Sequence, residues 1–263
     1  MSIITLTTDF GVCDSYVAQM KGAILTIAPE VQIVDVTHAI PPQDVRRAAA
    51  VIAEVAEVFP SGTVHVAVID PGVGSNRALL AAESAGQRFL APDNGLLTPL
   101  FRRFPPARCR RLADGRFWRN PVSATFHGRD ILAPVAAHLS RGADLAAFGP
   151  PVDTEKLVTL PPEEPRRVGS TLIGRVNAVD SFGNLITNIR DADLPSNDRR
   201  CFAVTLGECR IAGVNCCYAD VSHGKLVALI GSSGYLEIAV NGGSAARQTG
   251  AAAGTDVRVE QAS

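Results

Sequence analysis

Apolar and polar positions in the first 150 residues follow two different periods. Runs at 3–10, 31–37 and 63–70 are rich in β-branched residues and predict strands. Between them, 16–29 and 41–59 place apolar side chains three or four positions apart, the spacing of an amphipathic helix. The run 63–70 is almost continuously apolar, as a parallel strand covered on both faces requires. These patterns predict an α/β layered domain with a mainly parallel central sheet.

The same region continues with two more short strands and a third helix. Residues 78–84 and 88–93 are predicted strands, and 128–142 has the pattern of a helix that ends near Gly142. Pro134 lies inside that helix, where its ring opposes a regular first turn. We therefore expect it to kink the helix or to delay its start.

The pattern changes near residue 160. Residues 160–167, "LPPEEPRR", are proline-rich and charged, a composition typical of a semi-rigid spacer. Beyond them, short β-branched segments separated by glycine predict a small antiparallel barrel or sandwich. These segments lie at 170–179, 201–211, 225–233, 235–243 and 255–260. The sequence thus predicts an α/β domain at 1–159, a linker at 160–167 and a β-barrel-like domain at 168–263.

Composition and charge narrow the classes of partner. The 263 residues are 46% hydrophobic and carry a formal net charge of −1. This balance offers no electrostatic argument for binding nucleic acid or a membrane surface. The N-terminus has neither a basic region nor a small-residue cleavage site, and no apolar run is long enough to span a bilayer. We expect a cytoplasmic protein whose partner is a small molecule or another copy of itself.

Six cysteines are scattered along the chain, at 13, 109, 201, 209, 216 and 217. None forms a C-x-x-C pair, and the adjacent Cys216 and Cys217 are poorly placed to share one tetrahedral zinc. Reduced thiols, buried or half-buried, are therefore expected, and no metal site.

Acidic residues end or follow three predicted strands: Asp9 in "TTDFG", Asp70 in "VIDPG" and Asp93 in "APDNG". Ligands of parallel α/β sheets bind beyond the carboxyl ends of the strands. For Asp93 alone, a turn-forming carboxylate that caps its own backbone is the better interpretation. The glycine turn after Asp70 lacks the lysine and hydroxyl of a phosphate-binding P-loop and leads to Arg77 instead.

Three other segments combine polar chemistry with turn residues. "TFHGRD" places His127 at the mouth of the third helix, where it is either a functional group or a helix cap, and Arg129 and Asp130 can pair locally. "DSFGNLITN", residues 180–188, has the composition of a β-turn. "SSGYLEIAVNGG", residues 232–243, alternates polar and apolar side chains like an edge strand.

Seven segments together resemble, in order and spacing, the S-adenosyl-L-methionine hydroxide adenosyltransferases, the water-using relatives of the fluorinase and chlorinase enzymes. They are "TDFGVCDSYVAQMKG", "HAIPPQDV", "VIDPGVGSNR", "APDNGLLTP", "TFHGRDILAP", "DSFGNLITN" and "GSSGYLEIAVNGG". The resemblance covers residues 3 to about 259. It implies a homotrimer in which each active site lies between the α/β domain of one subunit and the β domain of its neighbour.

The resemblance also implies a catalytic set. Asp70, Arg77 and His127 correspond to an Asp-Arg-His set that positions a water facing C5′ of the ribose. The halogenases differ at the Asp70 and His127 positions, where a halide must be desolvated. Gln43 stands where the fluorinase has tryptophan, and Ser233 where it has arginine. The chain therefore resembles the water-using branch, although the residue that accepts the water proton remains open.

Further positions are implied to bind the substrate. Asp9 is expected to accept hydrogen bonds from both ribose hydroxyls, and Asp14 to support the methionine end. Phe182 and Asn184 are expected to meet adenine, while Asp180 and Ser232 hold the amino and carboxylate groups of the methionine part. The full implied set is Asp9, Asp14, Asp180, Phe182, Asn184, Tyr218, Ser232, Ser233, Asn241 and Gly242, with the last two reading the adenine edge and Tyr218 packing beside it.

The implied reaction is hydrolysis of S-adenosyl-L-methionine to adenosine and L-methionine, with that molecule as substrate and with no cofactor. Two alternatives remain open from the sequence. One is a 5′-halogenase that uses the same substrate. The other is a non-catalytic sensor that binds an adenosyl ligand in the same pocket.

Overall fold

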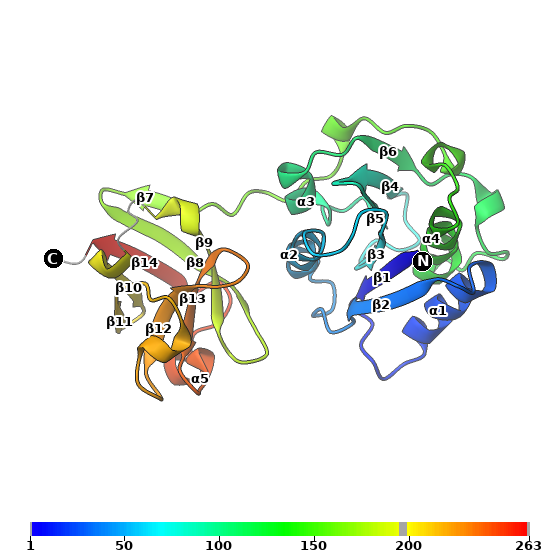
Figure 1. Ribbon diagram of the computed structural model, residues 1–263. Coiled ribbons are helices and arrows are strands. Elements are labelled where there is room, and N and C mark those ends of the chain that lie inside the picture. Colours follow the sequence, from blue (N-terminus) through cyan, green and yellow to red (C-terminus); the bar gives the residue numbers. More distant parts are fainter. Residues whose placement is uncertain (1, 195–198, 262–263) are drawn as a thin grey trace. The chain divides into compact units, whose positions relative to one another are not determined.

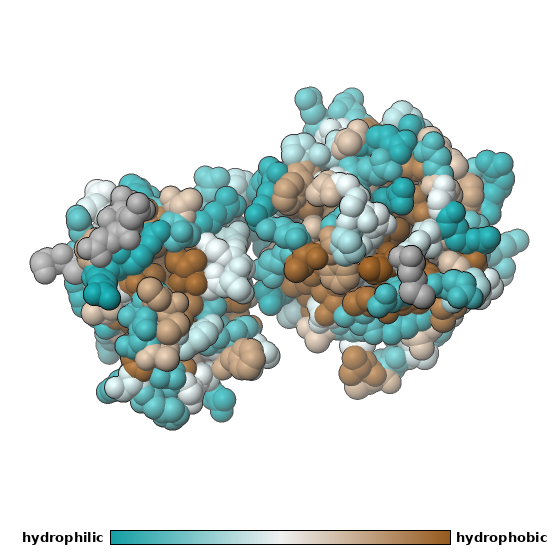
Figure 2. Space-filling model, viewed as in Figure 1, coloured by the Kyte–Doolittle hydropathy of each residue, from teal (hydrophilic) through white to brown (hydrophobic). Residues whose placement is uncertain are grey.

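The computed structural model describes residues 2–194 and 199–261 and divides the chain into two compact units, Met1–Leu160 and Pro161–Ser263 (Figure 1). The first unit is an α/β domain and the second is an antiparallel β domain. Arg166 and Arg167, at the end of the proline-rich segment, form part of strand β7 of the second unit. On the face drawn in Figure 2, hydrophilic residues make up much of the surface of each unit.

The first unit is built on a six-stranded sheet in the order β2-β1-β3-β5-β4-β6. The strands are β1 (Ile3–Thr8), β2 (Gln32–Thr37), β3 (Val64–Val68), β4 (Leu79–Ser84), β5 (Gln87–Pro92) and β6 (Arg108–Arg111). β2, β1, β3 and β5 pair in parallel, whereas β4 and β6 are antiparallel to their neighbours. The predicted mainly parallel sheet is thus confirmed.

Helices cover both faces of this sheet (Figure 1). On one face pack α1 (Tyr16–Ile27) and α4 (Ala133–Ser140), and on the other α2 (Val45–Val55) and α3 (Thr98–Arg103). Burial on both faces explains why the sequence of β3 is almost continuously apolar: Val64, Val66 and Val68 face α1 and α4, while Ala67 contacts the opposite cluster.

The helix expected at 128–142 is divided. Gly128–Leu132 form a turn of π-helix, and α4 begins only at Ala133, with Pro134 in its first turn. Proline is well accommodated at a helix start because the amide hydrogen it lacks would have no partner there. The expectation that Pro134 delays the helix is confirmed. The π-turn begins directly after His127, which has helical backbone angles.

The second unit is an almost closed antiparallel barrel in the strand order β11-β10-β14-β8-β9-β13-β12, with β7 paired to β8. The strands are β7 (Arg166–Val168), β8 (Thr171–Val179), β9 (Leu185–Arg190), β10 (Phe202–Leu206), β11 (Cys209–Ala212), β12 (Leu226–Ile230), β13 (Tyr235–Val240) and β14 (Asp256–Gln261). The backbone N–H of Asn215 donates to the Ala228 carbonyl at 2.7 Å and so links the segment after β11 to β12. A short helix, α5 (Ala245–Thr249), follows β13.

Several details differ from the sequence-based expectations. Helix α3 and strands β6 and β9 were not predicted, and the single run 201–211 forms two strands separated by a turn at Gly207. β13 lies between β9 and β12 and is not an edge strand, so that expectation is wrong. All six cysteines are free thiols, but Cys13, Cys216 and Cys217 are exposed, contrary to expectation. No helix of the described residues is long and apolar enough to cross a membrane.

Candidate active site

Two of the predicted site residues follow neighbouring parallel strands. Asp9 comes directly after β1, and Asp70 follows β3. Thr8 pairs with Val68 across these strands, so both acids emerge at the same edge of the sheet. Asp9 Oδ2 accepts a hydrogen bond of 2.8 Å from the backbone N–H of Gln43, which has a positive φ of 64°. This bond orients the Asp9 carboxylate.

Asp70, Arg77 and His127 form one hydrogen-bonded cluster. Arg77 Nε donates to Asp70 Oδ1 at 2.6 Å, and Arg77 Nη2 donates to Asp70 Oδ2. The same Nη2 lies 3.0 Å from His127 Nδ1. The side chains of Arg77 and Asp70 are only 10% and 6% exposed. The tertiary structure thus brings together three polar groups that span 57 positions of sequence.

The arginine determines the tautomer of the histidine. Guanidinium groups have N–H donors and no acceptor, so His127 Nδ1 accepts this bond and the neutral ring carries its proton on Nε2. The pKa of His127 is lowered, first by burial and then by the positive charge of Arg77, while Asp70 and Asp130 act in the opposite direction. The cluster therefore offers an N–H donor from His127 beside a carboxylate whose oxygens keep further lone pairs.

Two glycines allow the segments of this cluster to approach each other. Gly74 has a φ of +81°, and a Cβ there would lie 2.6 Å from the Ala124 carbonyl oxygen. A Cβ on Gly128 would lie 3.1 Å from Val68 Cγ1. The turn after Asp70 is therefore glycine-rich because it packs backbone against the segment that carries His127. This answers why a glycine turn is present without phosphate-binding residues.

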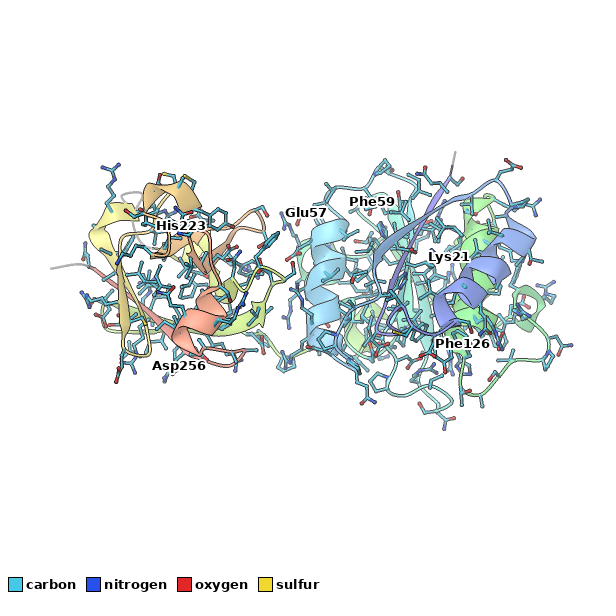
Figure 3. The ribbon with its side chains drawn as sticks, turned by 90° about the horizontal axis from the view of Figure 1, so that it is seen from below. Lys21, Glu57, Phe59, Phe126, His223 and Asp256 are labelled. Atoms are coloured by element: carbon cyan, nitrogen blue, oxygen red, sulfur yellow. The ribbon has the colours of Figure 1, made fainter. Side chains whose placement is uncertain are left out.

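Aromatic rings line the same edge. The rings of Phe10, Tyr16 and Phe126 contact one another pairwise at centroid distances of 5.4–5.7 Å. Phe126, labelled in Figure 3, lies near α1 and directly precedes His127. These contacts connect the segment after Asp9 to the His127 segment. Asp14, between Phe10 and Tyr16 in sequence, is exposed in the same loop.

Asp130 fixes the segment that carries His127. Its carboxylate is fully buried, accepts two hydrogen bonds from Arg129, and accepts another from the backbone N–H of Ser123. Arg119 lies 3.5 Å from it. The predicted local pairing of Arg129 and Asp130 is confirmed. The Asp130 carboxylate thus closes the 123–130 segment, which contains His127 and the start of the π-turn.

In the second unit, the turn between β8 and β9 carries Phe182 and Asn184, two of the predicted adenine-binding residues. Asp180 accepts hydrogen bonds from the backbone N–H groups of Phe182 and Asn184, at 2.9 and 2.8 Å, and from the Asn184 side chain at 2.9 Å. Asp180 therefore shapes the turn between β8 and β9. Phe182 is 75% exposed, so its ring is available for stacking.

The second predicted adenine segment lies against that turn. Gly183 leaves no space for a Cβ, which would lie 2.0 Å from Ser244 Oγ, and its carbonyl accepts from the Ala246 N–H. This contact places the 180–184 turn beside the segment after Asn241 and Gly242. Gly242 has a φ of 73° and packs on the ring of His223, which is labelled in Figure 3.

The remaining predicted residues lie at the other end of β13. Ser232 and Ser233 occupy the turn between β12 and β13. Tyr218 donates from its hydroxyl to Glu237 Oε1 at 2.7 Å, and this bond raises the pKa of Tyr218 to about 12. Glu237 was not predicted. Its signal in the sequence is a single charge inside the otherwise apolar strand "YLEIAV".

Asp93 forms a hydrogen bond that links two distant segments of the first unit. Its Oδ1 accepts a hydrogen bond of 3.0 Å from the backbone N–H of Val158, so it holds a distant segment and does not cap its own turn. Burial raises the pKa of Asp93. The next residue, Asn94, donates to the Ile69 carbonyl at 2.8 Å and thereby fixes the end of β3 just before Asp70. Asn94 is a supporting residue that the sequence analysis missed.

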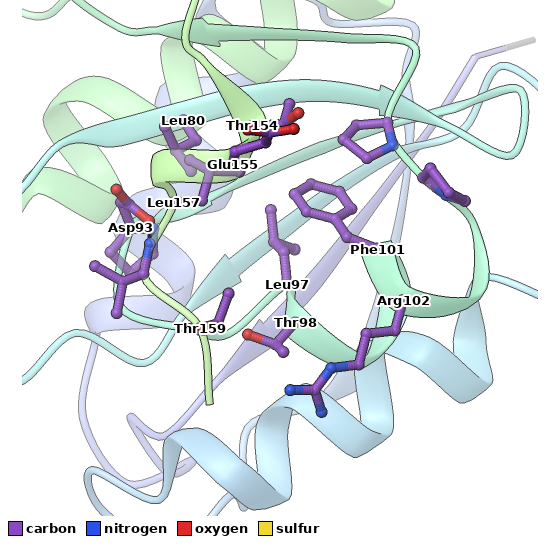
Figure 4. Close-up of a pocket in the computed structure, with 15 residues that line it drawn as sticks. Leu80, Asp93, Leu97, Thr98, Phe101, Arg102, Thr154, Glu155, Leu157 and Thr159 are labelled. Atoms are coloured by element: carbon purple, nitrogen blue, oxygen red, sulfur yellow. Dashed lines mark hydrogen bonds between the residues drawn. The ribbon is translucent and has the colours of Figure 1, made fainter. Parts of the chain in front are cut away.

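A cavity of about 250 Å³ adjoins Asp93 (Figure 4). Apolar side chains dominate its lining, including Leu80, Leu97, Phe101 and Leu157. None of the thirteen predicted site residues lines it. The cavity is therefore separate from the polar clusters described above. Within the described parts of the chain, no group of three or more His, Cys, Asp or Glu side chains is arranged to hold a metal ion.

Two family models match this chain, one in each of its two units. Residues 4–149 match the family model for the SAM hydroxide adenosyltransferase N-terminal domain, and residues 174–258 match the model for the C-terminal domain. A crystal structure of an uncharacterized conserved protein from Thermotoga maritima superimposes with a TM-score of 0.91 at 34% identity. The match covers 99% of this chain and 100% of that one.

Two named relatives differ in their sequence identity to this chain. The (R)-S-adenosyl-L-methionine hydrolase of Salinispora tropica is 38% identical over 257 residues, covering 97% of each protein. A fluorinase of Nocardia brasiliensis is 30% identical over 294 residues, covering 98% of this chain and 96% of the relative. The chain is thus more similar to this hydrolase than to this halogenase.

Proposed function

The chain belongs to the SAM hydroxide adenosyltransferase family, and from this we propose that it hydrolyses S-adenosyl-L-methionine to adenosine and L-methionine. The observation that carries the proposal is the buried hydrogen-bonded cluster of Asp70, Arg77 and His127. A carboxylate and an imidazole side by side suit a water nucleophile, because each can make one hydrogen bond to it.

In the proposed reaction a water oxygen forms a bond to C5′ of the ribose while the C5′–S bond breaks. The sulfur leaves with the bonding electron pair as the neutral thioether of methionine, so no general acid is needed. Asp70 accepts the proton of the water, and the Nε2–H of His127 orients the water oxygen. Arg77 holds both groups in place. General-base assistance of this kind typically contributes about 10²- to 10⁴-fold in rate.

The other predicted residues divide the substrate between the two units. Asp9 binds the ribose hydroxyls and Asp14 supports the methionine end, both from the first unit. From the second unit, adenine is bound by Phe182, Asn184, Asn241 and Gly242, with Tyr218 beside it. The amino-acid end is held by Asp180, Ser232 and Ser233. The grouping of the adenine-binding residues within the second unit is supported by the contact of Gly183 with Ser244, which joins the two adenine segments.

We further propose a homotrimer whose sites are shared between subunits, so that one chain supplies Asp70 and its neighbour Ser232. Mixing inactive Asp70→Ala chains with inactive Ser232→Ala chains should then restore part of the activity, because some sites receive two intact halves. Verified mixed trimers without activity would refute the sharing.

The test of the reaction is incubation of the protein with S-adenosyl-L-methionine in ¹⁸O-labelled water, followed by mass analysis of the nucleoside. We expect adenosine that carries one ¹⁸O atom. A parallel reaction with chloride distinguishes a halogenase, which forms 5′-chloro-5′-deoxyadenosine. Tight binding with return of intact substrate after prolonged incubation would indicate a sensor and refute catalysis.

A further inference from the structure

Glu237 is a carboxylate on a strand that is otherwise apolar. Its neighbours Leu236 and Ile238 are fully buried in the barrel core, and side chains alternate along a strand, so Glu237 lies on the outer face of β13. There it is paired in register with Ile186 and Leu229 and is only 8% exposed. A buried carboxylate is costly unless another group compensates it.

Its neighbours supply one hydrogen bond and no positive charge. Tyr218 donates to Oε1 at 2.7 Å, while Oε2 would lie 2.7 Å from a Cβ on Gly231. The carboxylate therefore sits beneath the turn that carries Ser232. In residues 2–194 and 199–261, no Lys, Arg or His forms an ion pair with Glu237. Burial raises the pKa of Glu237, and the negative charge of Asp180 acts in the same direction.

A buried carboxylate without a positive partner, beside an exposed aromatic residue, favours a cationic ligand. Tyr218 is 43% exposed, and aromatic faces attract cations. S-adenosyl-L-methionine carries two positive groups, a sulfonium and an α-ammonium. Only the ammonium has N–H donors, and a carboxylate forms its strongest bonds with such donors.

We propose that Glu237, oriented by Tyr218, is a further substrate-binding residue that accepts a hydrogen bond from the α-ammonium of S-adenosyl-L-methionine. This inference rests on the proposed function. The adjacent turn residue Ser232 is assigned to the same amino-acid end of the substrate, which places the ammonium near Gly231. Glu237 thus selects substrates that carry an amino-acid side arm over simple adenosyl thioethers.

The test uses Glu237→Gln, which keeps the shape of the side chain and removes its charge. Three ligands separate the possible contacts: S-adenosyl-L-methionine has sulfonium and ammonium, S-adenosylhomocysteine has only the ammonium, and 5′-methylthioadenosine has neither. The variant should raise KM for S-adenosyl-L-methionine and Kd for S-adenosylhomocysteine by about 10- to 100-fold, as expected for a lost charged hydrogen bond. Its kcat and its Kd for 5′-methylthioadenosine should stay within about threefold of wild type.

Two further variants control this result. Glu260→Gln makes the same change on β14, at a side chain that is 39% exposed, and should leave all three ligands unaffected. Tyr218→Phe keeps the ring but removes the donor to Glu237, and should weaken the two ammonium-bearing ligands without affecting 5′-methylthioadenosine. It also tests the inference independently if Glu237→Gln does not fold.

The outcomes are distinct. Equal weakening of all three ligands, or unchanged binding in both variants, overturns the role of Glu237. Loss confined to S-adenosyl-L-methionine assigns the carboxylate to the sulfonium and overturns the ammonium contact. A wild-type protein that binds none of these ligands refutes the proposed function itself.

Discussion

Removing the guanidinium of Arg77 should destabilise the first unit by about 3–5 kcal/mol. Arg77→Met keeps a long apolar stem but leaves the Asp70 carboxylate, which is only 6% exposed, without the two hydrogen bonds that it receives from Arg77. The cost is large because an unpaired charge then stays in a site with little access to water. His127 also loses the donor to its Nδ1.

A second change should recover part of this loss. In the double variant Asp70→Asn with Arg77→Met, no charge remains unpaired, so it should be more stable than Arg77→Met alone. We expect a coupling energy at the upper part of the range of about 0.5–3 kcal/mol for residues in direct contact. Arg103→Met is the control: its ion pair with Glu57 is 58% and 36% exposed, and its loss should cost under about 1 kcal/mol.

The assay is urea unfolding followed by the fluorescence of Trp118, the sole tryptophan of the chain, which packs against the core of the first unit. The probe therefore reports on the unit that contains the change. Two results would refute the reasoning. One is a cost for Arg77→Met no larger than that for Arg103→Met. The other is a double variant whose cost equals the sum of the two single costs within about 0.5 kcal/mol.

Three other predictions concern different parts of the first unit. Burial lowers the pKa of His65 from 6.5 to about 4, so the unfolded chain binds more protons below pH 6.5. The contribution of His65 to the free energy of unfolding should be constant above pH 6.5 and should fall by up to about 3 kcal/mol as the pH drops to 4. Free energies of unfolding from urea titrations of wild type and His65→Gln should therefore diverge over this range. Gly74→Ala should lower kcat by about 10²-fold, because its Cβ meets the Ala124 carbonyl and displaces the His127 segment. Gly62→Ala is the matched control, since Gly62 has a similar φ of +85° and no atom near its Cβ position, and equal losses of activity in the two variants would contradict the packing argument. Asp9→Ala should weaken adenosine binding by at least about 10-fold, and wild type should bind adenosine more tightly than 2′-deoxyadenosine; equal affinities in calorimetry would exclude Asp9 as the ribose ligand.

The sequence by itself determined the architecture of both units and the positions of the acids. Strand and helix periods are local properties, and the run at 63–70 indicates a strand covered on both faces wherever its partners lie. Because acids at the ends of parallel strands emerge at one edge, Asp9 and Asp70 could be expected together. The motifs also indicated the family and, through it, the candidate residues in both units.

Only the tertiary structure decided how those residues are joined. Arg77 lies 50 positions from His127, and no local pattern shows that one guanidinium contacts both Asp70 and His127 or that it determines the histidine tautomer. The alternation of "YLEIAV" has the pattern of an edge strand, yet β13 is internal because β12 and β9 pair with its two edges. Its outer face around Glu237 is buried in part by Tyr218, which comes from a distant loop. Burial and hydrogen bonding depend on what packs against a strand from elsewhere in the chain, and the order of residues within the strand does not contain that information.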